Sequence, residues 1–204
     1  MRLLVALFAL LCGAYAAKVG DKGKGYRVIE RDGQITCEYD GTFRIKADCN
    51  CRYADPPCKK GKVEHYIAYP GLRRKCKSKV ELRDSSTKDS KWTVRPSRSG
   101  GHTIAARDVD CANKYLSLAP GTDMDEMDYD HDSVDLVVSR SRKQEWIFKP
   151  SLDPSSTPSS KFCVDMVFIE PKGLNTYLNH NYPIAKCDGF TFDGYVGEWY
   201  LIPV

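Results

Sequence analysis

Hydrophobic and polar residues alternate in short runs along most of the chain. Tyr26 and Val28 precede an Asp32-Gly33 pair, and an alternating run up to Tyr39 follows it, before a second pair at Asp40-Gly41. An Asp-Gly pair between alternating runs is a strong short-range signal for a β-hairpin. We therefore predict a β-meander over residues 26–45.

Further short apolar runs, each followed by turn residues, continue to the end of the chain. The expected strands lie at residues 63–69, 80–82, 102–109, 134–138, 162–169 and 190–192. No amphipathic helical pattern of useful length occurs between them. Short strands with turn signals every eight to twelve residues predict an all-β barrel or sandwich.

A pattern of tryptophans divides these strands into three groups. Trp92, Trp146 and Trp199 lie 54 and 53 residues apart, and each begins a segment of the form Trp-x-apolar-x-Pro. A tyrosine followed by an aliphatic residue precedes each one, by 26, 31 and 22 residues: Tyr66, Tyr115 and Tyr177. A fixed period with variable loops indicates internal repeats. We expect three copies, near residues 44–96, 97–150 and 151–203.

Three sheet units that close about an axis leave no exposed strand edges. On this pattern the sequence resembles the β-trefoil superfamily, the threefold barrel shared by ricin-type lectins, growth factors, cytokines and Kunitz soybean-type inhibitors. The resemblance implies that the tryptophans fill equivalent places in the core. Gln144-Glu145-Trp146 matches the Gln-x-Trp motif of ricin-type lectins, whereas Ser90-Lys91-Trp92 and Gly197-Glu198-Trp199 depart from it.

The first sixteen residues have the pattern of a secretory signal peptide. Arg2 precedes an apolar run from Leu3 to Cys12, and Ala14-Tyr15-Ala16 forms an A-x-A cleavage site. The expected organisation is a signal peptide at 1–16, a flexible leader and β-meander at 17–43, and a β-trefoil at 44–204. The mature chain would start at Ala17, be secreted to the extracellular space and contain no membrane span.

Eight cysteines remain once Cys12 has been removed with the signal peptide. An even number in a secreted chain favours disulfides over a metal cluster, because the compartment is oxidising. Sequence alone does not give their pairing. The expected disulfide cysteines are Cys37, Cys49, Cys51, Cys58, Cys76, Cys111, Cys163 and Cys187.

The net charge of +4 conceals an asymmetry, because residues 17–107 carry +11 and residues 108–204 carry −8. Five cations fall within the seven residues 73–79, which we call the basic knuckle. Such a cluster is either ordinary solvated charge or a site for sulfated or phosphorylated polyanions, such as heparin. Its cations are Arg73, Arg74, Lys75, Lys77 and Lys79.

The acidic loop, residues 123–132, holds six carboxylates in ten positions. Calcium, which prefers oxygen ligands, is the only cofactor that the sequence suggests. An EF-hand is absent, since Ser133 and Ser139 replace the required Gly and Glu. A solvated loop, or one docked on the basic knuckle, is the alternative. The candidate calcium ligands are Asp123, Asp125, Asp128, Asp130 and Asp132.

The third copy places aromatic and amide residues close together in sequence. This chemistry suits a shallow carbohydrate site, to which Asp135 and Gln144 could also contribute. The candidate glycan-binding residues are Tyr177, Asn179, His180, Asn181, Tyr182, Asp135 and Gln144. None of the four histidines lies in a nucleophile or zinc motif, so we expect no enzymatic activity.

The sequence therefore favours a secreted, non-catalytic protein that binds an extracellular glycan or sulfated polysaccharide. A protease inhibitor of the trefoil type is one alternative, with residues 55–60 or 70–74 as the inhibitory loop. A growth-factor-like or cytokine-like ligand, or a defensive toxin, is another. The partners would be extracellular glycans or a secreted or cell-surface protein, and not nucleic acid.

Overall fold

The computed structural model describes residues 16–47, 65–69, 71–72, 75–76, 80–83, 90–107, 113–119, 133–141, 143–174, 176–181, 184–188 and 197–204. They form an all-β structure. The first strands are β1 (Lys22–Gly23), β2 (Tyr26–Arg31), β3 (Gln34–Tyr39), β4 (Gly41–Ala47), β5 (Tyr66–Ala68), β6 (Gly71–Leu72), β7 (Lys75–Cys76), β8 (Glu81–Arg83) and β9 (Trp92–Pro96). There follow β10 (His102–Ala106), β11 (Tyr115–Leu118), β12 (Ser133–Ser139), β13 (Trp146–Pro150), α2 (Ser159–Phe162), β14 (Val167–Pro171), β15 (Tyr177–Asn181), β16 (Ile184–Asp188) and β17 (Trp199–Pro203).

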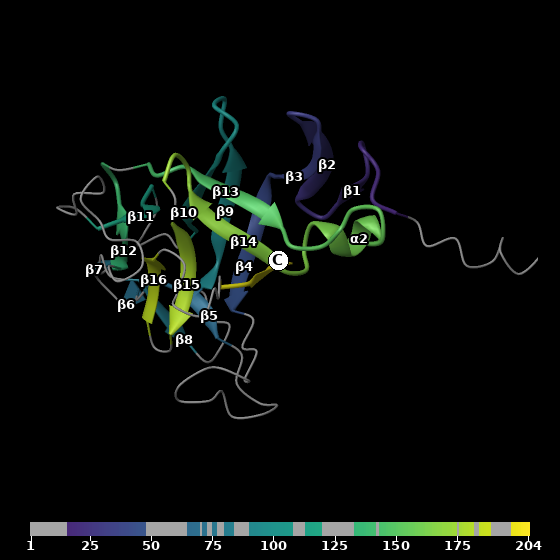
Figure 1. The fold of residues 1–204 in the computed structure, drawn as a ribbon. Helices are drawn as coiled ribbons and strands as arrows, with labels where there is room; N and C mark the ends of the chain where they lie inside the picture. The colour runs from purple at the N-terminus through teal and green to yellow at the C-terminus, as the bar shows by residue number, and fades with distance from the viewer. Residues whose placement is uncertain are drawn as a thin grey trace, which may run out of the picture.

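Six strands close into a barrel by antiparallel pairing. Going round it, β4 pairs with β9, β9 with β10, β10 with β13, β13 with β14, β14 with β17, and β17 with β4 again. The chain forms the hairpin β5–β8 between β4 and β9, the hairpin β11–β12 between β10 and β13, and the hairpin β15–β16 between β14 and β17. In Figure 1, β1–β3 and α2 lie at one side of the barrel, and β11, β12 and β16 lie at the other.

The three tryptophans begin barrel strands β9, β13 and β17 and are fully buried, which confirms that they belong to the core. Each indole N–H donates a hydrogen bond to the carbonyl of the residue that follows the repeated tyrosine. The acceptors for Trp92, Trp146 and Trp199 are Ile67, Leu116 and Leu178, at 3.0, 3.1 and 2.8 Å. The same bond therefore fastens each hairpin to the barrel.

The predicted meander is only half right. β2 and β3 pair around Asp32-Gly33, and both residues have positive φ, at 52° and 75°, as a tight hairpin turn requires. The second Asp-Gly pair does not form another hairpin, because β4 leaves β3 and pairs with β9 and β17. Barrel closure thus outweighs the local turn signal.

Two further expectations on local structure are also corrected. The expected strand 162–169 begins only at Val167, since α2 and a turn with positive φ at Met166 (38°) come before it. The expected flexible leader is part of the fold: the Gly20 N–H donates to the carbonyl of Val28, and the Val28 N–H donates to that of Asp21. Residues 190–192, expected as a strand, lie outside the described residues.

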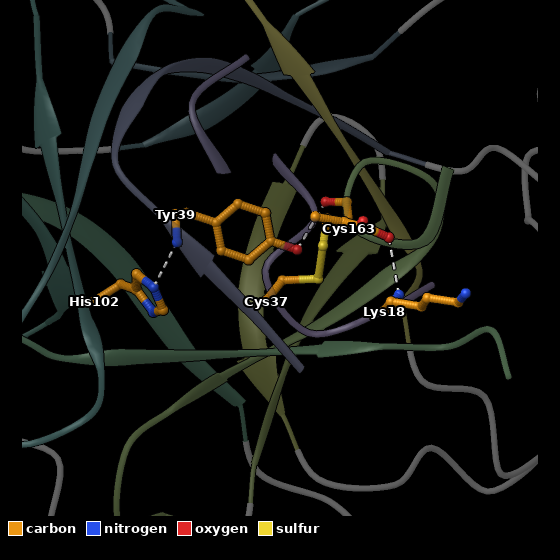
Figure 2. The surroundings of a disulfide bond; sticks show 6 residues. Lys18, Cys37, Tyr39, His102 and Cys163 are labelled. Atoms are coloured by element: carbon orange, nitrogen blue, oxygen red, sulfur yellow. Dashed lines mark hydrogen bonds between the residues drawn. A yellow bond between two sulfur atoms is a disulfide. The ribbon is translucent and has the colours of Figure 1, made fainter. Parts of the chain in front are cut away.

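A disulfide joins Cys37 of β3 to Cys163, which follows α2, across 126 residues of sequence (Figure 2). Beside it, the Tyr39 hydroxyl donates a hydrogen bond of 2.8 Å to the Cys163 carbonyl. The disulfide expectation is thus confirmed for one pair. For Cys76 and Cys187 only the strand positions are described, and the remaining expected cysteines, Cys49, Cys51, Cys58 and Cys111, lie outside the described residues.

Candidate functional site

The candidate glycan site lies on the sheet formed by β12, β16 and β15. β16 pairs with β12 on one side and with β15 on the other. The register aligns residues in rows across the three strands: Ser133–Asp188–Tyr177 and Asp135–Lys186–Asn179. These rows lie two positions apart on each strand, so strand alternation places them on the same face. Three predicted residues, Tyr177, Asn179 and Asp135, thereby hold neighbouring positions in the backbone register.

Tyr177 is the aromatic member of this face, and its side chain is partly exposed. The Lys149 Nζ lies 5.9 Å from the centre of its ring, close to the limit of a cation–π contact. The same Nζ lies 2.8 Å from the Glu170 carboxylate, so the cation is held between β14 and β15. A partly exposed aromatic ring thus has the ion pair of Lys149 and Glu170 beside it.

Asn179 lies two residues further along β15 and is also partly exposed. It packs against the backbone of Gly197, which precedes β17. A Cβ at position 197 would lie 2.6 Å from the Asn179 Oδ1 and 2.8 Å from the Leu178 carbonyl oxygen. Glycine is therefore required there, because a side chain at position 197 would collide with the Asn179 amide oxygen and the neighbouring backbone.

The other predicted glycan-binding residues lie outside this sheet, at the end of β15, or outside the described residues. Gln144 precedes β13, outside this sheet, and its amide donates to the carbonyl of Glu145. His180 and Asn181 end β15, opposite Ala185 and Ile184. Tyr182 lies outside the described residues. Sequence reasoning missed Lys186 and Asp188, which the register of β16 sets opposite Asn179 and Tyr177 of β15 and opposite Asp135 and Ser133 of β12.

Most residues of the two charged segments lie outside the described residues. Within the basic knuckle, Lys75 is placed on β7, opposite Leu72, while Arg73, Arg74, Lys77 and Lys79 lie outside the described residues. The whole acidic loop, with Asp123, Asp125, Asp128, Asp130 and Asp132, also lies outside them. Among the residues that are described, no three or more His, Cys, Asp or Glu side chains gather as metal ligands would.

A second polar cluster, which the sequence did not reveal, lies where the β9–β10 turn meets the segments before β13 and after β14. The Ser99 hydroxyl donates to the Glu145 carboxylate. The Lys172 Nζ lies 3.1 Å from that carboxylate and donates to the Ser99 carbonyl at 2.7 Å. Hydrogen bonds from Ser99, then Ser97 and Lys172, lower the pKa of Glu145 to about 2. The Glu145 and Lys172 charges are thus paired within the cluster, which joins the β9–β10 turn to the segments before β13 and after β14.

His102 is a buried histidine whose pKa is strongly lowered. It begins β10 and packs edge-on against the rings of Tyr39 and Phe148. Its Nε2 accepts the Tyr39 backbone N–H at 3.0 Å (Figure 2). Burial, and then the charge of Arg31, lowers the pKa of His102 to about 4, against smaller opposing effects from Glu38, the Trp146 backbone and Glu145. The imidazole is thus a neutral structural acceptor.

No protein-family model matches the chain, and no curated protein matches it. No helix in the described residues is long and apolar enough to cross a membrane.

Proposed function

We propose that the protein is a secreted, non-catalytic carbohydrate-binding protein with a β-trefoil fold. The fold proposal is supported by the order of its elements, since three hairpins are inserted between the paired strands of a six-stranded barrel. It is also supported by the three indole bonds, which join the same positions in each expected copy. Secretion rests on the signal-peptide pattern of residues 1–16.

The observation that carries carbohydrate binding is the register of β12, β16 and β15. It places Tyr177 in one row and both Asn179 and Asp135 in the next row on the same face. A sugar ring presents C–H groups that can pack on an aromatic ring, and hydroxyls that can both donate and accept hydrogen bonds. An amide and a carboxylate offer the complementary donor and acceptors beside such a ring. Tyr177, Asn179 and Asp135 thus supply, at neighbouring positions of the register, the kinds of group that a neutral sugar requires.

The charged residues in the same rows bear on the class of glycan. Lys186 stands between Asp135 and Asn179, and Asp188 stands between Ser133 and Tyr177. By sequence the two rows hold two acidic residues, Asp135 and Asp188, and one basic residue, Lys186, so they carry no large excess of one sign. This balance favours neutral oligosaccharides at this site. Sulfated chains would bind instead at the basic knuckle, through long-range attraction that salt weakens.

A glycan array tests the proposal directly when it includes heparin fragments and is run with calcium and with a chelator. We expect calcium-independent binding to one class of neutral oligosaccharide. Binding confined to sulfated chains and abolished by salt would contradict the assignment of the site to β12–β16–β15. Failure to bind any glycan at low salt would contradict the function itself. Trypsin, subtilisin and papain inhibition assays on the same sample test the inhibitor alternative.

A further inference from the structure

The backbone nitrogen of Ala17 has an unusual environment for a residue next to a predicted cleavage site. It lies 3.1 Å from the carbonyl oxygen of Pro154 and 3.0 Å from that of Thr157. The Ala17 side chain is only 4% exposed and packs in the hydrophobic core. Ala16, just before it, forms an isolated β-bridge with Pro158. The start of the expected mature chain is thus docked on the loop before α2.

Two acceptors at one backbone nitrogen fit an ammonium group better than an amide. A peptide nitrogen carries a single hydrogen, which the two carbonyl oxygens must share in a bifurcated bond. An α-ammonium group carries three, so each oxygen can accept its own hydrogen bond. Such bonds are also stronger, because the donor is charged.

The acceptor loop is held in place independently of Ala17. The Ser155 N–H donates to the Asp153 carboxylate at 2.8 Å, and the Ser156 N–H donates to the Asp153 carbonyl at 3.2 Å. Phe162 N–H donates to the Pro158 carbonyl at 3.0 Å, and Cys163 then forms the disulfide with β3. The site is therefore preorganised.

Charge around the site is compatible with a cation. Asp21 and Asp153 supply carboxylates in the two segments that meet there, and Asp21 accepts the Lys18 backbone N–H at 2.9 Å. The nearest cations along the same segments, Lys18 and Lys161, are exposed. The ammonium group would thus add a positive charge next to carbonyl oxygens, between segments that each carry a carboxylate.

We propose that an endopeptidase of the signal-peptidase class cleaves the Ala16–Ala17 bond, and that the new α-ammonium group binds between the carbonyls of Pro154 and Thr157. Water adds across the peptide bond, which leaves a carboxylate on Ala16 and an ammonium group on Ala17. Cleavage precedes docking, because the buried Ala17 does not present an extended substrate to a protease. The inference rests on the proposed secretion and is independent of the carbohydrate ligand.

Two chains of native sequence test this binding site, one starting at Ala17 and the other at Ala16. In the longer chain the nitrogen of residue 17 remains an amide, so it serves as the matched control. The α-amino pKa is read from the 13C shifts of the first residue as pH is varied. We expect it to lie about one unit above the ordinary 7.7–8.0 in the Ala17 chain and within that range in the Ala16 chain. The Ala16 chain should also melt about 2–4 °C lower.

The first residue of the secreted protein, found by N-terminal sequencing, must be Ala17. A different first residue overturns the proposal, whatever the protein binds. An ordinary or lowered α-amino pKa in the folded Ala17 chain also overturns it. Glycan binding measured on the same two chains separates this inference from the proposed function, since the α-amino result does not depend on it.

Discussion

At the scale of single residues, His102 makes the stability of the protein depend on pH. Its folded-state pKa of about 4 lies below the ordinary value of 6.5. As pH falls below 6.5, the unfolded chain takes up a proton that the folded chain does not, so stability decreases until pH reaches about 4. The free energy of unfolding should fall by about 3 kcal/mol over this pH range.

Urea unfolding between pH 7 and pH 4.5 measures this loss. Glu145 does not interfere, because its lowered pKa means that its contribution is lost only below its ordinary value of 4.5. His102→Gln is the control: it removes the titration and keeps a side-chain oxygen that can accept the Tyr39 N–H. We expect a markedly flatter pH profile in this variant, in which the other three histidines remain. An unchanged profile would contradict the role given to His102.

At the scale of elements, the Cys37–Cys163 disulfide connects the N-terminal hairpin to the loop before β14. Removing it as the double Ala variant should destabilise the protein by about 2–5 kcal/mol, since it closes a long loop in the unfolded chain. Thermal unfolding of the variant, compared with the oxidised and reduced native protein, measures the effect. Equal stability of all three would contradict the disulfide's structural role, and peptide mapping would reveal any other partner of Cys37.

The three tryptophan segments should contribute similarly to the free energy of unfolding if they occupy equivalent places in the barrel. Trp92→Phe, Trp146→Phe and Trp199→Phe each remove a buried N–H donor and leave a carbonyl without that bond. We expect each variant to lose about 2–4 kcal/mol in urea unfolding. A variant with a loss below about 1 kcal/mol would show that its copy does not share the common arrangement.

Local sequence patterns could predict most elements but not their partners. The Asp32-Gly33 turn and the three tryptophan strands follow from alternation and period, which act over a few residues. The pairing of β12 with β16 joins segments about fifty residues apart, so no local signal indicates it. The strand expected at residues 162–169 begins only at Val167, because α2 and the turn at Met166 come before it.

At the scale of the whole molecule, the candidate site also combines residues that local patterns could predict with residues that depend on strand pairing. Tyr177 and Asn179 could be proposed from sequence, because they alternate on one strand beside other polar residues. Lys186 and Asp188 could not, since their positions opposite Asn179 and Tyr177 depend on the register of β16 with β15. Gln144 was included for its resemblance to a lectin motif, yet it lies outside this sheet and bonds to its own neighbour.

The most direct test of carbohydrate binding compares two tyrosines in equivalent positions. Tyr115 begins β11 as Tyr177 begins β15, and it too has a lysine over its ring, with Lys143 Nζ at 5.0 Å. Titration calorimetry with the best oligosaccharide from the array should show at least a tenfold loss of affinity, about 1.4 kcal/mol, in Tyr177→Ala and no change in Tyr115→Ala. Equal affinities of both variants and the native protein would contradict the proposed site.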